Sequence, residues 1–70
     1  MEKIYIRDDQ IKLGQALKLA GAVGSGVDAK FVINEGSVSV NGISCMQRGK
    51  KLKENDIITF EGKEYIICKM

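Results

Sequence analysis

The sequence predicts a single α+β domain in which two short helices pack on a small, mostly antiparallel sheet of three to five short strands. The first observation behind this class is the length, 70 residues, which suffices for one small core. The second is the spacing of apolar residues, which changes along the chain from a strand period to a helix period and back. The third is the order of the segments, one strand, two helices and then several strands, which differs from the alternation of a parallel-sheet protein.

An N-terminal strand and a first helix open the chain. Residues 3–7 alternate, with two isoleucines on one face of the expected strand. From Lys12 the apolar residues follow one helical face, and Gly21 supplies the end of the helix. Gly14 lies inside this helix, where Gly is less favourable than Ala by about 1 kcal/mol. The start of the first helix is therefore less well defined than its buried face, which consists of Leu13, Ala16, Leu17 and Ala20.

A second helix is expected between Ser25 and Gly36. Ser25 and Asp28 have the spacing of a capping box, with Asp in place of the usual Glu or Gln. The segment that joins the two helices is rich in small residues, so the pair forms a helix-loop-helix unit. The buried face of the second helix is expected to contain Ala29, Val32 and Ile33.

Short strands are expected after the second helix. Val38 and Val40 point to the core, and Asn41-Gly42 is a strong signal for a tight hairpin turn. Leu52 is expected to anchor the loop that comes after the basic residues 48–51. The remaining strands are predicted within residues 43–45, 54–60 and 63–69.

The composition argues against several classes of function. The chain has no His, so neither a zinc-type site nor histidine acid–base catalysis is expected, and no cofactor is predicted. The stretch "GAVGSG" lacks the Lys-Ser/Thr of a phosphate-binding loop, and no nucleophile–base pair is apparent, so an enzyme is not expected. A small β-grasp carrier is disfavoured because the chain ends "ICKM" rather than Gly-Gly. No secretion signal or membrane-spanning stretch is apparent, so we expect a cytoplasmic protein. In that compartment Cys45 and Cys68 are expected to be reduced thiols, and one disulfide between them is the alternative.

The basic residues gather in one segment although the net charge is only +2. Between Met46 and Lys53 the chain has four basic residues and no acidic one. Such a run repels itself, and phosphate is the counter-charge that suits it best. Ordinary solubilising residues are the alternative interpretation. The run includes Arg48, Lys50 and Lys51 as candidate contacts.

Both helices add candidate contacts outside their apolar faces. On the first helix these are Lys12, Gln15 and Lys18, although Lys18 also suits the helix C-terminus without any ligand. On the second helix, Lys30 lies on the solvent side and Phe31 lies far from the core stripe. Phe31 either packs as a second small apolar patch on the sheet or is an exposed aromatic on which a base can stack.

Taken together, these segments resemble the RNA-binding domain named after small-subunit ribosomal protein S4, which is also called the alpha-L motif. The resemblance is closest to the small stand-alone bacterial members of that family. It implies a single RNA-binding domain over residues 1–70, with a core motif at about 11–60 and flanking strands at about 3–7 and 63–69. The matching stretches are "IKLGQALKLAG" (11–21), "SGVDAKFVINEGSVSVNG" (25–42), "RGKKL" (48–52) and "NDIITF" (55–60).

The resemblance implies a protein that binds structured RNA, either ribosomal RNA or tRNA-like shapes, in ribosome assembly or in association with the ribosome. A monomer is the simple expectation. The sequence departs from the family at Gly14, where many relatives have Asp, and at Phe31, where many have Arg or Lys. The alternative is a protein-interaction module that docks on a ribosomal protein or an assembly factor through Val27 and Phe31. The positions that the family pattern marks as RNA-facing are Lys12, Lys18, Ser25, Lys30, Arg48, Lys50 and Lys51, to which the residues themselves add Gln15 and Phe31.

Overall fold

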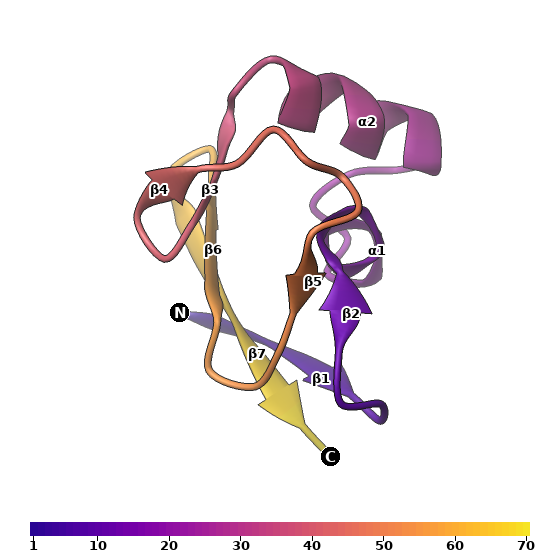
Figure 1. The fold of residues 1–70 in the computed structure, drawn as a ribbon, viewed down its shortest axis with the longest axis vertical. Helices are drawn as coiled ribbons and strands as arrows, with labels where there is room; N and C mark the ends of the chain where they lie inside the picture. Colours follow the sequence, from indigo (N-terminus) through magenta and orange to yellow (C-terminus); the bar gives the residue numbers. More distant parts are fainter.

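The computed structural model describes residues 1–70 and confirms the α+β class, with two helices and seven short strands (Figure 1). Both helices were predicted, and the cap at Ser25 and the stops at Gly21 and Gly36 agree with the structure. The start of the first helix was less well defined, and the structure places it at Leu13, with Lys12 in the preceding strand. In chain order the elements are β1 (Glu2–Ile6), β2 (Ile11–Lys12), α1 (Leu13–Leu19), α2 (Gly26–Asn34), β3 (Val38–Val40), β4 (Ile43–Ser44), β5 (Lys51–Leu52), β6 (Ile57–Phe60) and β7 (Lys63–Lys69).

Five strands form the main sheet, in the order β1-β7-β6-β3-β4. Three of its four pairings are antiparallel, as expected, and the edge strand β1 runs parallel to β7. A separate sheet of two strands joins β2 to β5, with Ile11 opposite Leu52 and Lys12 opposite Lys51. The sequence did not indicate this second sheet, because two-residue strands are too short to show a period. It is nevertheless the pairing that brings the basic segment to the start of α1.

The core lies between the main sheet and the two helices, which are both on one side of it (Figure 1). The predicted faces of the helices are confirmed, since five of the seven apolar residues on these faces are fully buried and the other two, Ala20 and Val32, are half-buried at the rim. Leu52 is also fully buried, as predicted, and anchors β5 in the same core. The side chains of the two helices that are fully buried are those of Leu13, Ala16, Leu17, Ala29 and Ile33.

The Asn41-Gly42 turn is linked to the turn before β6 by side-chain hydrogen bonds. Both turn residues have positive φ, 51° and 83°, as a tight hairpin of this kind requires. The Asn41 amide nitrogen donates to Asp56 Oδ1 at 3.1 Å, and the Ile57 N–H donates to Asn41 Oδ1 at 3.0 Å. Asp56 Oδ2 also accepts from the Lys53 N–H at 2.9 Å. The hairpin and the far end of the basic segment are therefore fixed relative to each other.

Candidate functional site

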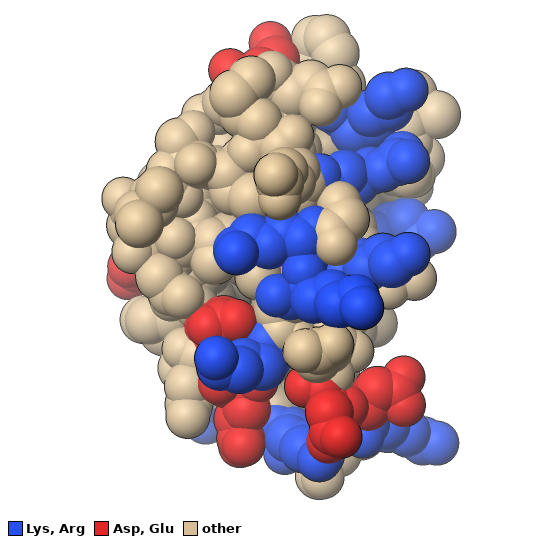
Figure 2. All heavy atoms as spheres, viewed as in Figure 1, with Lys and Arg blue, Asp and Glu red and all other residues tan.

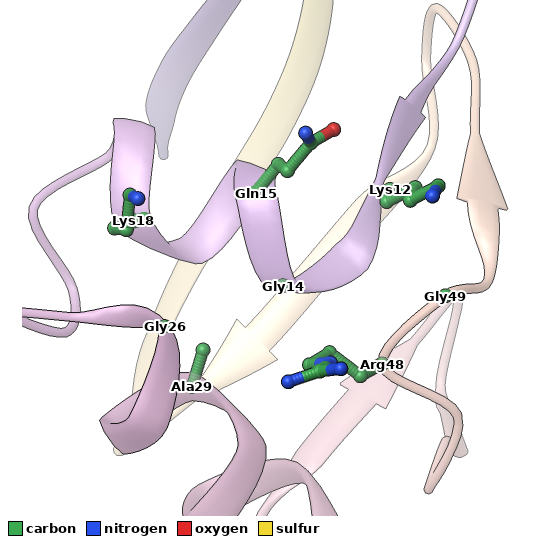
Figure 3. A pocket seen from close by; sticks show the side chains of 8 residues that line it. All are labelled: Lys12, Gly14, Gln15, Lys18, Gly26, Ala29, Arg48 and Gly49. Atoms are coloured by element: carbon green, nitrogen blue, oxygen red, sulfur yellow. The ribbon is translucent and has the colours of Figure 1, made fainter.

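A hollow of about 300 Å³ lies where α1, α2 and the segment between β4 and β5 meet (Figure 3). We call it the α1–α2 hollow. Three of its residues are cationic and none is acidic. In Figure 3 the Arg48 side chain lies between the two helices, and the two lysines stand toward opposite ends of α1. The lining residues are Lys12, Gly14, Gln15, Lys18, Gly26, Ala29, Arg48 and Gly49.

Backbone hydrogen bonds hold the basic segment against the start of α1. The Leu13 N–H donates to the Lys50 carbonyl at 2.8 Å, and the Gly14 N–H donates to the Arg48 carbonyl at 3.0 Å. These bonds satisfy N–H groups that have no partner within the helix itself. Because the segment is held by its backbone, the charged ends of its side chains are not used to fix it.

Gly14 leaves the space through which the stem of Arg48 passes. A Cβ at residue 14 would lie 2.6 Å from Arg48 Cγ and 3.3 Å from Arg48 Cδ, both too close for the present side-chain position. Any other residue at this position would therefore displace the Arg48 side chain. The close approach explains why a residue with poor helix propensity stands in the first turn of α1.

Two lysines face each other beside the hollow. Lys12 is directly opposite Lys51 in the β2–β5 pair, an arrangement of like charges that is unfavourable for folding. None of the basic residues that line the hollow has a carboxylate within 4.0 Å. The structure has one ion pair, between Lys69 and Asp9, away from the hollow. The hydrogen bond that Lys69 donates to Asp9, together with the attraction of their charges, lowers the pKa of Asp9 and raises that of Lys69.

The basic atoms form a band across one face of the molecule. In Figure 2 the Lys and Arg atoms gather over the region of α2, α1 and β5, while most Asp and Glu atoms lie at the margins and below. A surface of this kind attracts anions although the net charge of the chain is only +2.

The structure brings together four of the nine candidate residues and separates the others. Lys12, Gln15, Lys18 and Arg48 line the α1–α2 hollow. Lys51 lies next to it through its pairing with Lys12. The remaining four, Ser25, Lys30, Phe31 and Lys50, do not line it.

Each of these four has a definite position. Ser25 caps α2, where its Oγ accepts a hydrogen bond from the Asp28 N–H at 3.1 Å. Lys50 lines a different hollow, beside the β3–β4 hairpin. Lys30 is exposed on α2. Phe31 is 62 % exposed, so the interpretation that it packs on the sheet is wrong.

Sequence reasoning missed the small residues of the hollow, which are Gly14, Gly26, Ala29 and Gly49. Gly14 carried a usable signal, because a glycine within a helical pattern commonly marks a close approach. The other three are a helix start, a core position and a loop residue, and nothing in their sequence context marks them as site residues.

The structure contains neither a cluster of metal ligands nor a membrane-spanning helix. No group of three or more His, Cys, Asp or Glu side chains lies together in a way that could hold a metal ion. Cys45 and Cys68 are both free thiols and half-buried. Neither helix has the length and apolar character that are needed to cross a membrane.

Comparisons with known proteins agree with this architecture. A family model described as "S4 domain" matches residues 4–68. A Bacillus subtilis (strain 168) protein named "Probable ribosome maturation protein RlbA" is 42% identical over 59 residues, which cover 84% of this chain and 83% of that protein.

Two solved structures share the fold. The solution structure of YbcJ from E. coli, described as revealing an alpha-L motif involved in RNA binding, is similar with a TM-score of 0.74 and 28% identity, over 97% of this chain and 87% of that one. The 30S ribosomal protein S4e from Thermoplasma acidophilum is similar in fold, with a TM-score of 0.66 and 20% identity, over 86% of this chain and 32% of that one.

Proposed function

The chain belongs to the S4 domain family, and on that premise we propose that it binds structured RNA, specifically ribosomal RNA, without catalysing a reaction. The relatives support RNA binding and a ribosomal target. One is named as a probable ribosome maturation protein, and another has a motif described as involved in RNA binding. The protein would act as a monomer in the cytoplasm, on ribosomal particles during their maturation.

The observation that carries the proposal is the α1–α2 hollow. Lys12, Lys18 and Arg48 come from three parts of the site and have no carboxylate partners, so they are available to phosphates. Lys12 is the N-cap of α1 and Lys18 lies in its last turn, so the two cations stand at opposite ends of the helix. That spacing favours contact with a path of several phosphates. Phosphate contacts of this kind recognise the shape of an RNA helix or junction rather than its sequence.

The like-charged pair beside the hollow supports the same function. Lys12 and Lys51 repel each other in the free protein, and a phosphate placed between them would remove that repulsion. Proteins often keep unfavourable local arrangements where a ligand is bound. We therefore add Lys51 to the contacts of the hollow.

The remaining candidates would extend the contact surface. Lys30 and Lys50 lie outside the hollow and would meet phosphates further along the RNA. Ser25 would donate its hydroxyl proton, because its oxygen already accepts from Asp28. Phe31 is two residues beyond Ala29, about 200° around the helix from the hollow, so any base stacked on it belongs to another part of the RNA.

The test is crosslinking in the cells from which the protein comes, followed by sequencing of the bound RNA. The wild-type protein is expected to recover ribosomal RNA beyond its abundance in the cell. The double variant Lys12→Gln and Arg48→Gln should lose this enrichment, because both cations leave the hollow while their aliphatic stems remain.

The matched control is the double variant Lys3→Gln and Lys63→Gln, which also lowers the net charge from +2 to 0. These lysines lie on β1 and β7 and line neither the hollow nor its rim. The control should crosslink like the wild type. Crosslinks that follow RNA abundance in the wild type would refute a ribosomal target, and equal losses in the two double variants would refute the site.

Replacing Gly14 with Ala is expected to weaken RNA binding without a change in charge. The added methyl group must displace the Arg48 stem, since Cβ and Cγ would be 2.6 Å apart. The better helix propensity of Ala, about 1 kcal/mol, should offset much of the packing cost. We expect a free energy of unfolding close to that of the wild type, measured by urea titration, and a reduced RNA affinity, measured by fluorescence anisotropy. Unchanged RNA affinity together with unchanged stability would show that the position of Arg48 is unimportant.

A second candidate function is docking on a ribosomal protein or an assembly factor. It rests on Val27 and Phe31, which are 77 % and 62 % exposed and one turn apart on α2. Such binding would depend little on salt and would be lost on Phe31→Ala, whereas RNA binding through the hollow weakens steeply as salt rises.

A further inference from the structure

A second hollow, of about 730 Å³, lies next to the first, between α1 and the end of β1. We call it the α1–β1 hollow. Gln15 and Lys18 line both hollows, so the two adjoin each other at the exposed side of α1. In Figure 3 the Gln15 amide points away from Arg48, on the side of α1 that does not face α2. A ligand bound in the first hollow could therefore continue into the second.

The α1–β1 hollow has an exposed aromatic side chain in its lining. Tyr5 is 50 % exposed, and Leu19 and Met70 beside the same hollow are also exposed. Together they form an apolar surface that the rest of the chain does not cover. A flat apolar group is the natural occupant of such a surface, and an aromatic ring is the side chain on which nucleic-acid bases stack.

The charges of this hollow are favourable for a phosphate. Arg7 and Lys18 line it, and neither has a carboxylate within 4.0 Å. Asp8 is the one acidic residue in the lining, so the cations exceed the anions by two to one. Lys18 lines both hollows, so a phosphate bound to it would lie between them. The RNA chain could then extend from one hollow into the other.

The size of the hollow fits a small organic group rather than a duplex. Its volume is within the range of about 300–1,000 Å³ that is typical of small-molecule sites. A paired base cannot enter it, because its faces are covered by its neighbours in the helix. A bulged or looped-out nucleotide has both faces free, and proteins commonly recognise such nucleotides by stacking and by hydrogen bonds to their edges.

We propose that the α1–β1 hollow binds one unpaired nucleotide of the RNA whose helix contacts the α1–α2 hollow. Its base stacks on Tyr5, its phosphate lies between Arg7 and Lys18, and the Gln15 amide bonds the base edge or the sugar. This inference rests on the proposed RNA binding and adds a specific feature of the target, an extruded nucleotide beside a helix. The apolar surface alone would also suit a protein partner, but its position next to the cationic hollow favours RNA.

The test compares a fully paired RNA hairpin with the same hairpin carrying one bulged fluorescent purine. The wild-type protein should bind the bulged hairpin more tightly by about 5- to 150-fold, the gain typical of one stacked base. The fluorescence of the purine should fall on binding. Tyr5→Leu should bring the two affinities together and leave binding to the paired hairpin unchanged, whereas Tyr5→Phe keeps the ring and should keep the preference. Arg7→Gln should lower the log–log salt slope by about 0.7–0.9 for the bulged hairpin only.

The possible outcomes separate this inference from the proposed function. Equal wild-type affinity for the two hairpins would overturn the inference and leave RNA binding by the α1–α2 hollow intact. An equal loss of affinity for both hairpins in Tyr5→Leu would also overturn it, because Tyr5 would then act through the fold. If the chain instead bound a protein, and this binding persisted at high salt and was lost in Tyr5→Leu, the hollow would be assigned to a protein partner. No wild-type binding to either hairpin would refute both proposals.

Discussion

Replacing Lys12 and Arg48 with Glu is expected to lower RNA affinity by at least about 100-fold while the fold keeps its stability. A hydrogen bond that involves a charged group contributes roughly 1.5–3 kcal/mol. The loss of two such bonds to phosphate therefore amounts to about 3 kcal/mol or more, which corresponds to the stated factor. The new carboxylates also repel the RNA backbone, so the loss should exceed that of the neutral Gln variants.

The stability of this variant follows from the position of Lys12 opposite Lys51. A Glu at residue 12 converts a repulsive cross-strand pair into an attractive one. Opposite charges in such a pair contribute roughly 0.2–1 kcal/mol. The Arg48 stem loses its packing over Gly14, and this loss lowers the stability of the fold. The two effects are of similar size, so the melting temperature should change by only a few degrees.

The measurements are fluorescence anisotropy at several salt concentrations and thermal melting followed by circular dichroism. The control replaces Lys3 and Lys63 with Glu, which changes the net charge equally, from +2 to −2. A control that loses RNA affinity as strongly as the double variant would show that binding follows overall charge and not the hollow. Greatly reduced stability of the double variant would contradict our account of the Lys12–Lys51 pair.

Local signals explain how much of the fold could be predicted. Ser25 was identified as a helix cap and Asn41-Gly42 as a tight turn, and the structure confirms both. The pairing of β2 with β5 was not predictable, because it joins two residues to two others about forty positions away. The link from Asn41 to Asp56 was missed for the same reason, since the turn signal of Asn41 says nothing about what its side chain bonds.

The candidate site could be predicted in part. Gln15 and Lys18 share the exposed side of α1 and Lys12 is its N-cap, so helical spacing is sufficient to group the three. Arg48 joins them only through the tertiary fold, by way of its carbonyl bond to Gly14. Lys50 is two residues from Arg48 but lines another hollow, so the basic run does not act as the compact cluster that its sequence suggests. The α1–β1 hollow was missed entirely, because Tyr5 has the sequence context of an ordinary strand residue.

Leu52→Ala is expected to destabilise the protein strongly and to release the basic segment from α1. Leu52 is fully buried, and truncation of a buried Leu to Ala typically costs about 2–5 kcal/mol. Proteins are stable by about 0.05–0.15 kcal/mol per residue, so this loss is a large part of the total for so short a chain. For a domain of this size the melting temperature should fall by on the order of 10–40 °C. The control is Ile43→Ala, because Ile43 is 73 % exposed and its truncation should change the melting temperature little.

Leu52 also connects the core to the site, because β5 begins directly after the segment whose carbonyls bond the first turn of α1. The Leu13 and Gly14 N–H groups donate to residues 50 and 48, so their hydrogen exchange reports whether that segment stays in place. In Leu52→Ala these two amides should exchange faster than those of β6 and β7, at a temperature where the variant is still folded. Uniform acceleration across the chain would mean that Leu52 stabilises the whole fold without a particular effect on the segment. Selective acceleration, with a parallel fall in RNA affinity, would show that the core places Arg48 at the hollow through β5.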